Sequence, residues 1–284
     1  SLDLLRQAGE SLAGRIEYVE LAPFDVLEVV ENHQDLVRLW VRGGFPDSYL
    51  AADDDNSFAF RRNFIRTYLQ RDIPQFAPRI PSETLERLWT MLAHAQGGPL
   101  NASRLAANLS VSAPTVTHHV DLLVDLLLVR RLPPFHVNDR KRLVKSPRIY
   151  VRDSGLVHAL IGIRDFDTLA GHPVVGASWE GFVIENLLNI AAPDVTAGFY
   201  RTAGGAEIDL VLRLPGETDP WAIEIKRGTS ARPSRGFHQA CADIGAARRF
   251  VVHAGRGHER LSYDLEAIGV REMAMILNTE AGGS

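Results

Sequence analysis

The chain has 284 residues, 45% of them hydrophobic and 23% charged, which is the composition of an ordinary globular protein with room for two or three domains. Its formal net charge of −4 carries no overall signal for nucleic acid, so any basic surface must be local. The one cysteine, Cys241, excludes internal disulfides and a cysteine-based zinc site. No apolar run could span a membrane and no signal peptide opens the chain, so we expect a cytoplasmic protein without a membrane partner.

The first 80 residues carry mostly helical patterns. A short strand is predicted for Ile16 to Leu21, and a helix for Phe24 to Trp40, before the breaker Gly43-Gly-Phe-Pro46. Phe58 to Gln75 also has apolar residues at helical spacing. We predict that this helix exposes a solvated basic face, formed by Arg61, Arg62, Arg66 and Arg71.

This region resembles the second half of a family of bacterial and archaeal AAA-type ATPases, in which it forms a helical lid after the ATPase strands. The segments that carry the resemblance are Ser11-Leu-Ala-Gly-Arg15, Leu21-Ala-Pro23, Gly43-Gly-Phe-Pro46 and Tyr68-Leu-Gln-Arg-Asp-Ile73. The chain has no Gly-x-x-x-x-Gly-Lys-Ser/Thr loop to hold phosphates, so it should not hydrolyse ATP by itself. Because it also opens at Ser1 without Met, we expect ATP binding, and homo-oligomers formed through the ATPase half, only in a longer parent chain.

Residues 81–152 predict a winged helix-turn-helix. Ser82 opens one helix, Asn101 caps a second, and Ser110-Val-Ser112 turns into a third helix from about Pro114 to Leu127. This spacing is typical of a helix-turn-helix, whose second helix lies against DNA. The side chains expected to face outward from that helix are Thr115, Thr117, His118 and His119.

Two further strands, one starting at Val129 and one from Leu143 to Val151, would form the wing. Between Val129 and Arg152 the sequence has eight Lys or Arg residues and one acidic residue, Asp139, an excess suited to phosphate contacts. DNA is therefore the expected partner, although winged helices also pack against proteins. The candidate DNA-binding residues are Thr115, Thr117, His118, Arg140, Lys141, Arg142 and Lys145.

A β-hairpin is predicted from two segments that alternate apolar and polar residues, 206–214 and 221–226, on either side of a turn rich in Pro and Gly. Strict alternation would place Glu207 and Asp209 on one face of the first strand, opposite Ile208. Glu224 and Lys226 would share a face of the second strand. The hairpin would then bring Asp209, Glu224 and Lys226 together, a set suited to Mg²⁺ and an activated water. A solvated charged hairpin is the alternative.

The Asp…Glu-x-Lys arrangement resembles the PD-(D/E)xK core of restriction-endonuclease-like nucleases. The C-terminal domain of the ATPase family is similar to the same nucleases. The resemblance implies that Asp209 and Glu224 bind Mg²⁺ and that Lys226 assists the attacking water. It also requires an acidic residue on the first core helix, for which Glu180 is our candidate and Glu185 the alternative. Ile208 stands where the motif usually has Pro, which leaves room for an inactive copy.

The sequence thus predicts an α/β and α multidomain protein: an ATPase remnant with a helical lid (1–80), a winged helix-turn-helix (81–152) and a restriction-endonuclease-like α/β domain (153–284). The expected function is Mg²⁺-dependent hydrolysis of DNA at Glu180, Asp209, Glu224 and Lys226. The alternative is an inactive module that binds DNA or protein under the control of the missing ATPase half. A transcriptional regulator that uses only the winged helix would leave the hairpin without a role.

Overall fold

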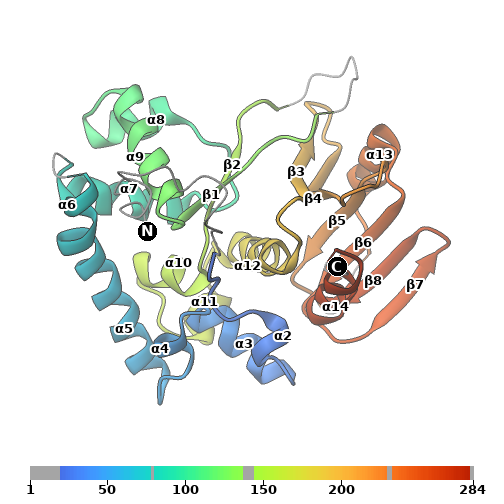
Figure 1. The fold of residues 1–284 in the computed structure, drawn as a ribbon, viewed down its shortest axis with the longest axis horizontal. Coiled ribbons are helices and arrows are strands. Elements are labelled where there is room, and N and C mark those ends of the chain that lie inside the picture. The colour runs from blue at the N-terminus through green and yellow to red at the C-terminus, as the bar shows by residue number, and fades with distance from the viewer. Residues whose placement is uncertain (1–19, 78–79, 137–143, 229–231, 282–284) are drawn as a thin grey trace, which may run out of the picture.

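The protein is described here from a computed structural model, which covers residues 20–77, 80–136, 144–228 and 232–281. It is a mixed α/β structure in which a helical N-terminal part lies beside a C-terminal β-sheet (Figure 1). Within the described residues, no helix is long and apolar enough to cross a bilayer.

The N-terminal part consists of short helices. The predicted helix from Phe24 to Trp40 is divided, because Asn32 caps a new helix by accepting hydrogen bonds from Gln34 N and Asp35 N. Most of the predicted strand from Ile16 to Leu21 lies outside the described residues. The elements are α2 (Val26–Val29), α3 (His33–Arg42), α4 (Pro46–Tyr49), α5 (Asp54–Thr67), the π-helical turn η1 (Tyr68–Asp72) and α6 (Ile73–Phe76).

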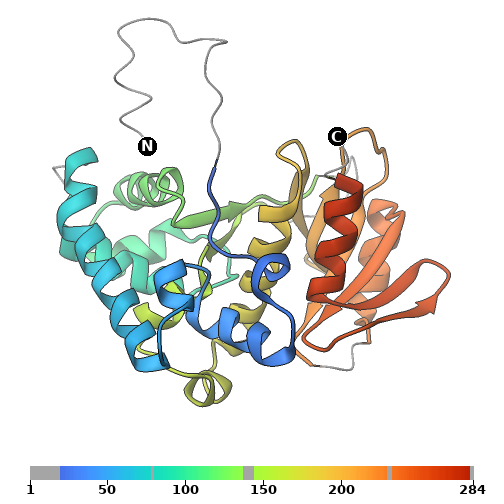
Figure 2. The ribbon, with the colours of Figure 1, turned by 60° about the horizontal axis from the view of Figure 1, so that its bottom comes forward.

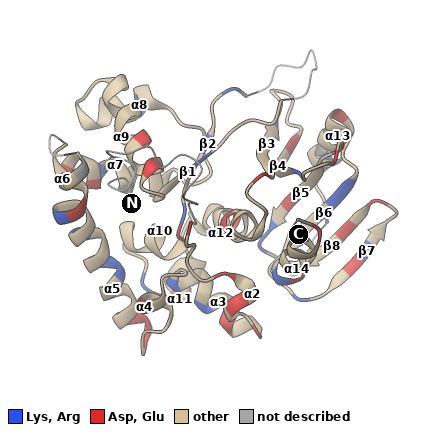
Figure 3. Ribbon diagram, in the orientation of Figure 1, with Lys and Arg blue, Asp and Glu red and all other residues tan. Residues whose placement is uncertain are grey.

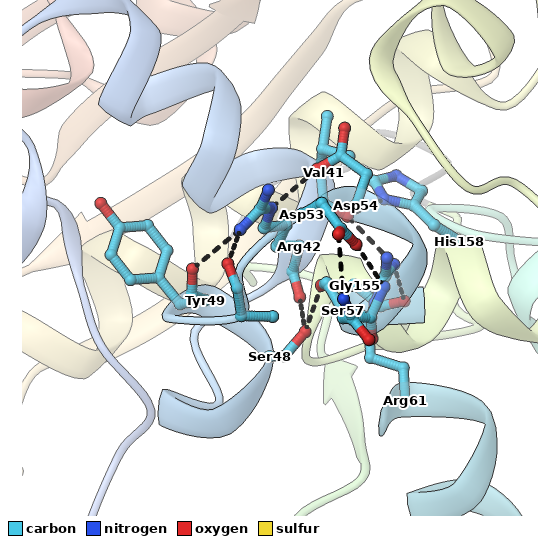
Figure 4. A network of polar contacts seen from close by, with 12 residues as sticks. Val41, Arg42, Ser48, Tyr49, Asp53, Asp54, Ser57, Arg61, Gly155 and His158 are labelled. Carbon is cyan, nitrogen blue, oxygen red and sulfur yellow. Dashed lines mark hydrogen bonds and ion pairs between the residues drawn. The ribbon is translucent and has the colours of Figure 1, made fainter. Parts of the chain in front are cut away.

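The prediction of a solvated basic face on α5 is wrong for Arg61, which is fully buried. Its guanidinium donates hydrogen bonds to the carbonyl oxygens of Ser57, Val41 and Gly155 (Figure 4). Burial lowers the pKa of Arg61 to about 10. Arg61 therefore joins α5 to the end of α3 and to the start of the next helix of the core, α10 (Ser154–Leu160), while the other three arginines are exposed as predicted.

The middle of the chain follows the predicted order of three helices and two strands: α7 (Ser82–His94), α8 (Ala102–Leu109), α9 (Ala113–Asp125), β1 (Val129–Leu132) and β2 (Arg148–Val151). Asn101 and Ser112 cap α8 and α9, and Ser110 makes the turn between them with a positive φ of 55°. The strands pair antiparallel and are shorter than predicted. Arg140, Lys141 and Arg142 lie outside the described residues.

The C-terminal part is built around a six-stranded mixed sheet of order β3-β4-β5-β6-β8-β7. β3, β4 and β5 are antiparallel, β5, β6 and β8 are parallel, and β7 returns antiparallel at the edge. The strands are β3 (Thr196–Arg201), β4 (Glu207–Arg213), β5 (Trp221–Lys226), β6 (Arg248–His253), β7 (His258–Ser262) and β8 (Leu265–Gly269). The helices here, besides α10, are α11 (Phe166–Ala170), α12 (Val175–Ile190), α13 (Arg235–Ile244) and α14 (Val270–Ala281).

Helices cover both faces of the sheet (Figures 1 and 2). One face, with Leu210 and Ile223, belongs to a large apolar cluster that includes α12 and α14 and continues to Val26 of α2. The other face, with Val211 and Ala222, packs against α13 in a smaller cluster. The three predicted units therefore share one core.

Buried polar contacts also join the two parts of the molecule. His158 of α10 contacts the carbonyl oxygen of Val41 through Nδ1 (2.9 Å) and Ser178 Oγ of α12 through Nε2 (2.7 Å). Ser178 also accepts a hydrogen bond from Trp40 Nε1, and the ring of Trp40 meets that of Trp179 edge-on at 5.2 Å. α3, α10 and α12 thus form one tightly connected layer.

Candidate functional site

The predicted β4–β5 hairpin is present, with Leu210 opposite Ile223 and Leu212 opposite Trp221. On its other side, β4 pairs with β3 through a β-bulge, since two β4 residues, Asp209 and Leu210, lie between pairs that enclose one β3 residue, Phe199. The prediction that successive side chains of β4 alternate strictly between the two faces of the sheet is therefore wrong. Ile208 and Val211 both pack on the α13 side, whereas Leu210 and Leu212 pack on the α12 side.

The bulge places Asp209 where the paired part of β4 and β5 ends. Its Oδ2 accepts a hydrogen bond of 2.9 Å from the backbone N–H of Ile225, and its side chain is 16% exposed. Burial, together with the negative charge of Glu180, raises the pKa of Asp209 to about 7. Asp209 is therefore an enclosed carboxyl that titrates near neutral pH.

An arginine that the sequence did not single out lies among three carboxylates. Arg148, the first residue of β2, has Nη1 at 3.2 Å from Glu180 and 3.6 Å from Asp209, and its Nη2 binds Glu207. The guanidinium is 4.7 Å from the ring centroid of Phe199. Burial lowers the pKa of Arg148, but the negative neighbours more than offset this and raise it above its ordinary value. The carboxylates thus enclose a permanent protein cation.

Of the two candidate glutamates on α12, Glu180 is the one in this cluster. It accepts a hydrogen bond of 2.6 Å from Tyr150 Oη, and burial raises its pKa although Arg148 opposes that shift. Glu185 instead binds Arg152 at 2.9 Å and Arg130. Glu185 therefore joins α12 to β1 and β2.

Glu224 and Lys226 pair with each other, although the charge of Lys226 also acts to lower the pKa of Glu180. Glu224 is on the opposite face from Ile223 and Ile225, and its Oε2 accepts a hydrogen bond of 2.9 Å from the backbone N–H of Ser234, the N-cap of α13. Its Oε1 is 2.6 Å from Nζ of Lys226. Asp209 thus contacts β5 at Ile225, between these two residues, and it pairs with Arg148, whereas Glu224 pairs with Lys226.

These contacts do not fit Mg²⁺ held by Asp209 and Glu224. Each carboxylate already has cationic or N–H partners, and a divalent ion would have to displace them. Within the described residues, no three His, Cys, Asp or Glu side chains are grouped as a metal site.

The candidate DNA-facing helix, α9, exposes part of its predicted surface. Thr117 and His118 are exposed, while Thr115 is half-buried with its Oγ1 at 2.7 Å from Ser112 Oγ. The prediction that His119 faces outward is wrong, because α9 buries positions 116, 119, 120 and 123 at helical spacing. Burial lowers the pKa of His119.

Internal ion pairs engage much of the basic excess of the predicted wing. Arg130, Arg131, Arg148 and Arg152 each pair with an acidic side chain, and Lys145 is the one exposed basic residue of 144–152. Basic and acidic residues are interspersed over both parts of the described chain (Figure 3).

Sequence reasoning missed Arg148, Tyr150 and Glu207. All four residues of β2 are buried. An arginine at the start of this otherwise apolar strand was therefore the available signal that an acidic side chain lies beside it in the interior. Glu207 was placed beside Asp209 but given no role.

The described residues define a mixed α/β protein. Its helical part and its sheet meet at a cluster of three carboxylates that pair with Arg148. Residues 33–167 match a family model described as a domain of unknown function (DUF8612), and residues 175–273 match another domain of unknown function (DUF4143). The chain is also similar to uncharacterized proteins of Mycobacterium tuberculosis and Mycobacterium bovis, each 42% identical over 268 residues, or 94% of this chain. The chain spans 60% of the length of these relatives. No solved structure matches it.

Proposed function

We propose that this chain is a non-catalytic, DNA-binding module of a longer AAA-type ATPase. It would combine a helical lid, a winged helix and a restriction-endonuclease-like domain, and ATP would bind only to the parent protein. The observation that carries its non-catalytic character is the position of Arg148 among Glu180, Glu207 and Asp209.

The order of elements supports the two fold assignments. The succession α7, α8, α9, β1, β2, with a short turn between α8 and α9, suits a winged helix. The succession α12, β3, β4, β5, α13, β6 gives three antiparallel strands followed by a parallel crossover, with one helix on each face. This order suits the predicted nuclease-like core, in which Glu180 lies on α12 and Asp209 on β4.

Charge balance supports the absence of catalysis. A nuclease of the predicted type needs an exchangeable divalent cation between its carboxylates, where it can activate water. Arg148 supplies a fixed positive charge there instead, and its guanidinium stays protonated at any physiological pH. Such a cation neutralises the carboxylates but cannot bind water as a metal does.

The test combines three measurements on the wild type and on Asp209→Asn. We expect a labelled DNA duplex to bind both proteins equally and with strong salt dependence. Calorimetry should detect no Mg²⁺ or Mn²⁺ binding, and supercoiled plasmid should stay intact. Weaker DNA binding after the exposed residues Thr117, His118 and Lys145 are changed to Ala would place the contact on the winged helix. A wild type that binds no DNA contradicts the proposal.

A metal-dependent nuclease is the second candidate, because Glu180 and Asp209 lie in one cluster and Asp209 is enclosed with a raised pKa. It requires that Arg148 withdraw when the parent protein or DNA moves β2. Nicking that depends on Mn²⁺ and is lost in Asp209→Ala would establish this candidate and remove the first.

A further inference from the structure

The exposed start of α13 carries a basic surface that belongs neither to the acidic cluster nor to the predicted winged helix. Lys226 ends β5, and Arg227, Arg232 and Arg235 follow it before and within the first turn of α13. All three arginines are exposed. Within the described residues, none of the three makes an ion pair or a side-chain hydrogen bond, unlike the arginines of β1 and β2.

Glu224 holds this surface together. One of its oxygens accepts the N–H of Ser234 and the other contacts Nζ of Lys226, so the end of β5 and the N-terminus of α13 are bound to the same carboxylate. Glu224 is buried, with 6% of its side chain exposed. The surface therefore presents three arginines to solvent, and the half-buried Lys226 beside them is paired with the inward-facing acid.

A surface hollow lies beside Arg235. A hollow of about 590 Å³ lies between the β3–β4 turn and α13, lined by residues that include Gly204, Gly205, Arg235 and Gly236. Gly236 must be glycine because a Cβ there would lie 2.5 Å from the carbonyl oxygen of Gly205. Arg235 therefore stands at the rim of this hollow, beside the point where the β3–β4 turn packs against the first turn of α13.

We infer that Lys226, Arg227, Arg232 and Arg235 form a second nucleic-acid contact surface, which binds phosphates of the DNA backbone without reading its sequence. Three of the four cations are arginines, whose planar guanidinium groups bind phosphate oxygens in pairs. The inference rests on the proposed DNA-binding function and adds the C-terminal domain to it. Glu224 and Lys226 then serve to position this surface rather than to cleave DNA.

The experiment measures binding of a fluorescent 30-base-pair duplex by anisotropy, from about 50 to 300 mM KCl, a range over which binding to phosphates weakens strongly. The variant is Arg227→Ala/Arg232→Ala/Arg235→Ala. The control is Arg62→Ala/Arg66→Ala/Arg71→Ala, which removes the same charge from an exposed face of α5 and η1. Thermal unfolding of each variant checks that the exposed changes leave the fold intact.

We expect the α13 variant to bind at least tenfold more weakly and to reduce the salt slope by about 2 to 3, because each phosphate that a cation neutralises adds about 0.9 to that slope. The control should stay within twofold of the wild type. A salt slope unchanged in the α13 variant, or an equal loss of affinity in the control, overturns the inference.

Two further arms separate this inference from the proposed function. If Thr117→Ala/His118→Ala/Lys145→Ala weakens DNA binding but the α13 variant does not, the winged helix binds DNA and the second surface does not exist. If poly-glutamate binds the α13 surface and DNA does not, the surface fits an acidic protein, and the inference falls with the proposed function.

Discussion

Nη1 of Arg148 lies 3.6 Å from Oδ1 of Asp209 and 3.2 Å from Glu180, so a residue of β2 carries the positive charge that balances carboxylates of β4 and α12. The side chain of Arg148 is 6% exposed. A buried cation with several acidic partners cannot be removed without leaving those partners uncompensated. The relationship therefore makes Arg148 a determinant of stability, whatever the module binds.

We expect Arg148→Ala to lower the free energy of unfolding by about 3 to 5 kcal/mol at pH 7.5, because it leaves buried carboxylates without their cation. Arg131→Ala is the control, since its pair with Asp121 is partly exposed and should be worth about 0 to 1 kcal/mol. Urea unfolding followed by circular dichroism measures both. Equal losses in the two variants would show that the cluster does not depend on Arg148.

The raised pKa of Asp209 predicts a specific dependence of stability on pH. The unfolded carboxyl ionises near its ordinary value of 3.8, whereas the folded one keeps its proton until about pH 7. The folded state therefore loses stability as the pH rises between these values, by roughly 3 to 4 kcal/mol. Asp209→Asn, which keeps an acceptor for Ile225 N–H, should remove this slope in urea unfolding from pH 4.5 to 8. Parallel curves for the two proteins would contradict the prediction.

His158 predicts the opposite slope. Burial lowers its pKa from 6.5 to about 3, so the unfolded state takes up a proton first as the pH falls. The free energy of unfolding should therefore decrease as the pH falls from 6.5 to 3, by at most roughly 4 to 5 kcal/mol. His158→Gln should flatten the acid side of the stability curve and leave the slope above pH 7 unchanged. A steeper acid loss in the variant would rule out a buried neutral imidazole.

A pair of glycines tests the packing of α10. A Cβ at Gly155 would lie 2.2 Å from the carbonyl oxygen of Arg42, whereas a Cβ at Gly176 of α12 meets nothing within 4 Å. Gly155→Ala should therefore cost about 1 to 3 kcal/mol, while Gly176→Ala should be neutral or stabilise by about 0.5 to 1 kcal/mol. Thermal unfolding of both variants under one set of conditions gives the comparison.

Local patterns predicted much of the secondary structure. Asn101 identified the start of α8, because a cap depends on the next three residues, and the turn Ser110-Val-Ser112 located the start of α9 to within one residue. Alternation with a Pro- and Gly-rich turn identified β4 and β5. Each of these signals lies within a few residues of the element it specifies.

The site depended on contacts between distant segments. The bulge at Asp209 is set by the pairing of β4 with β3, and Arg148 arrives from another part of the chain. Arg61 was expected in solvent because its own helix gives no sign of the carbonyl groups of Val41 and Gly155 that surround it. Hydrophobic periodicity reports which face of a helix is buried, but not which polar groups lie opposite it.

The edge-on contact of Trp40 with Trp179 has a mechanical consequence. Trp179 is the residue before Glu180 on α12, and Ser178, which binds Trp40 and His158, is the residue before that. Close-packed side chains of this kind transmit a displacement without absorbing it. We therefore expect a displacement of α3 to shift the start of α12, and with it the carboxylate of Glu180 that faces Arg148.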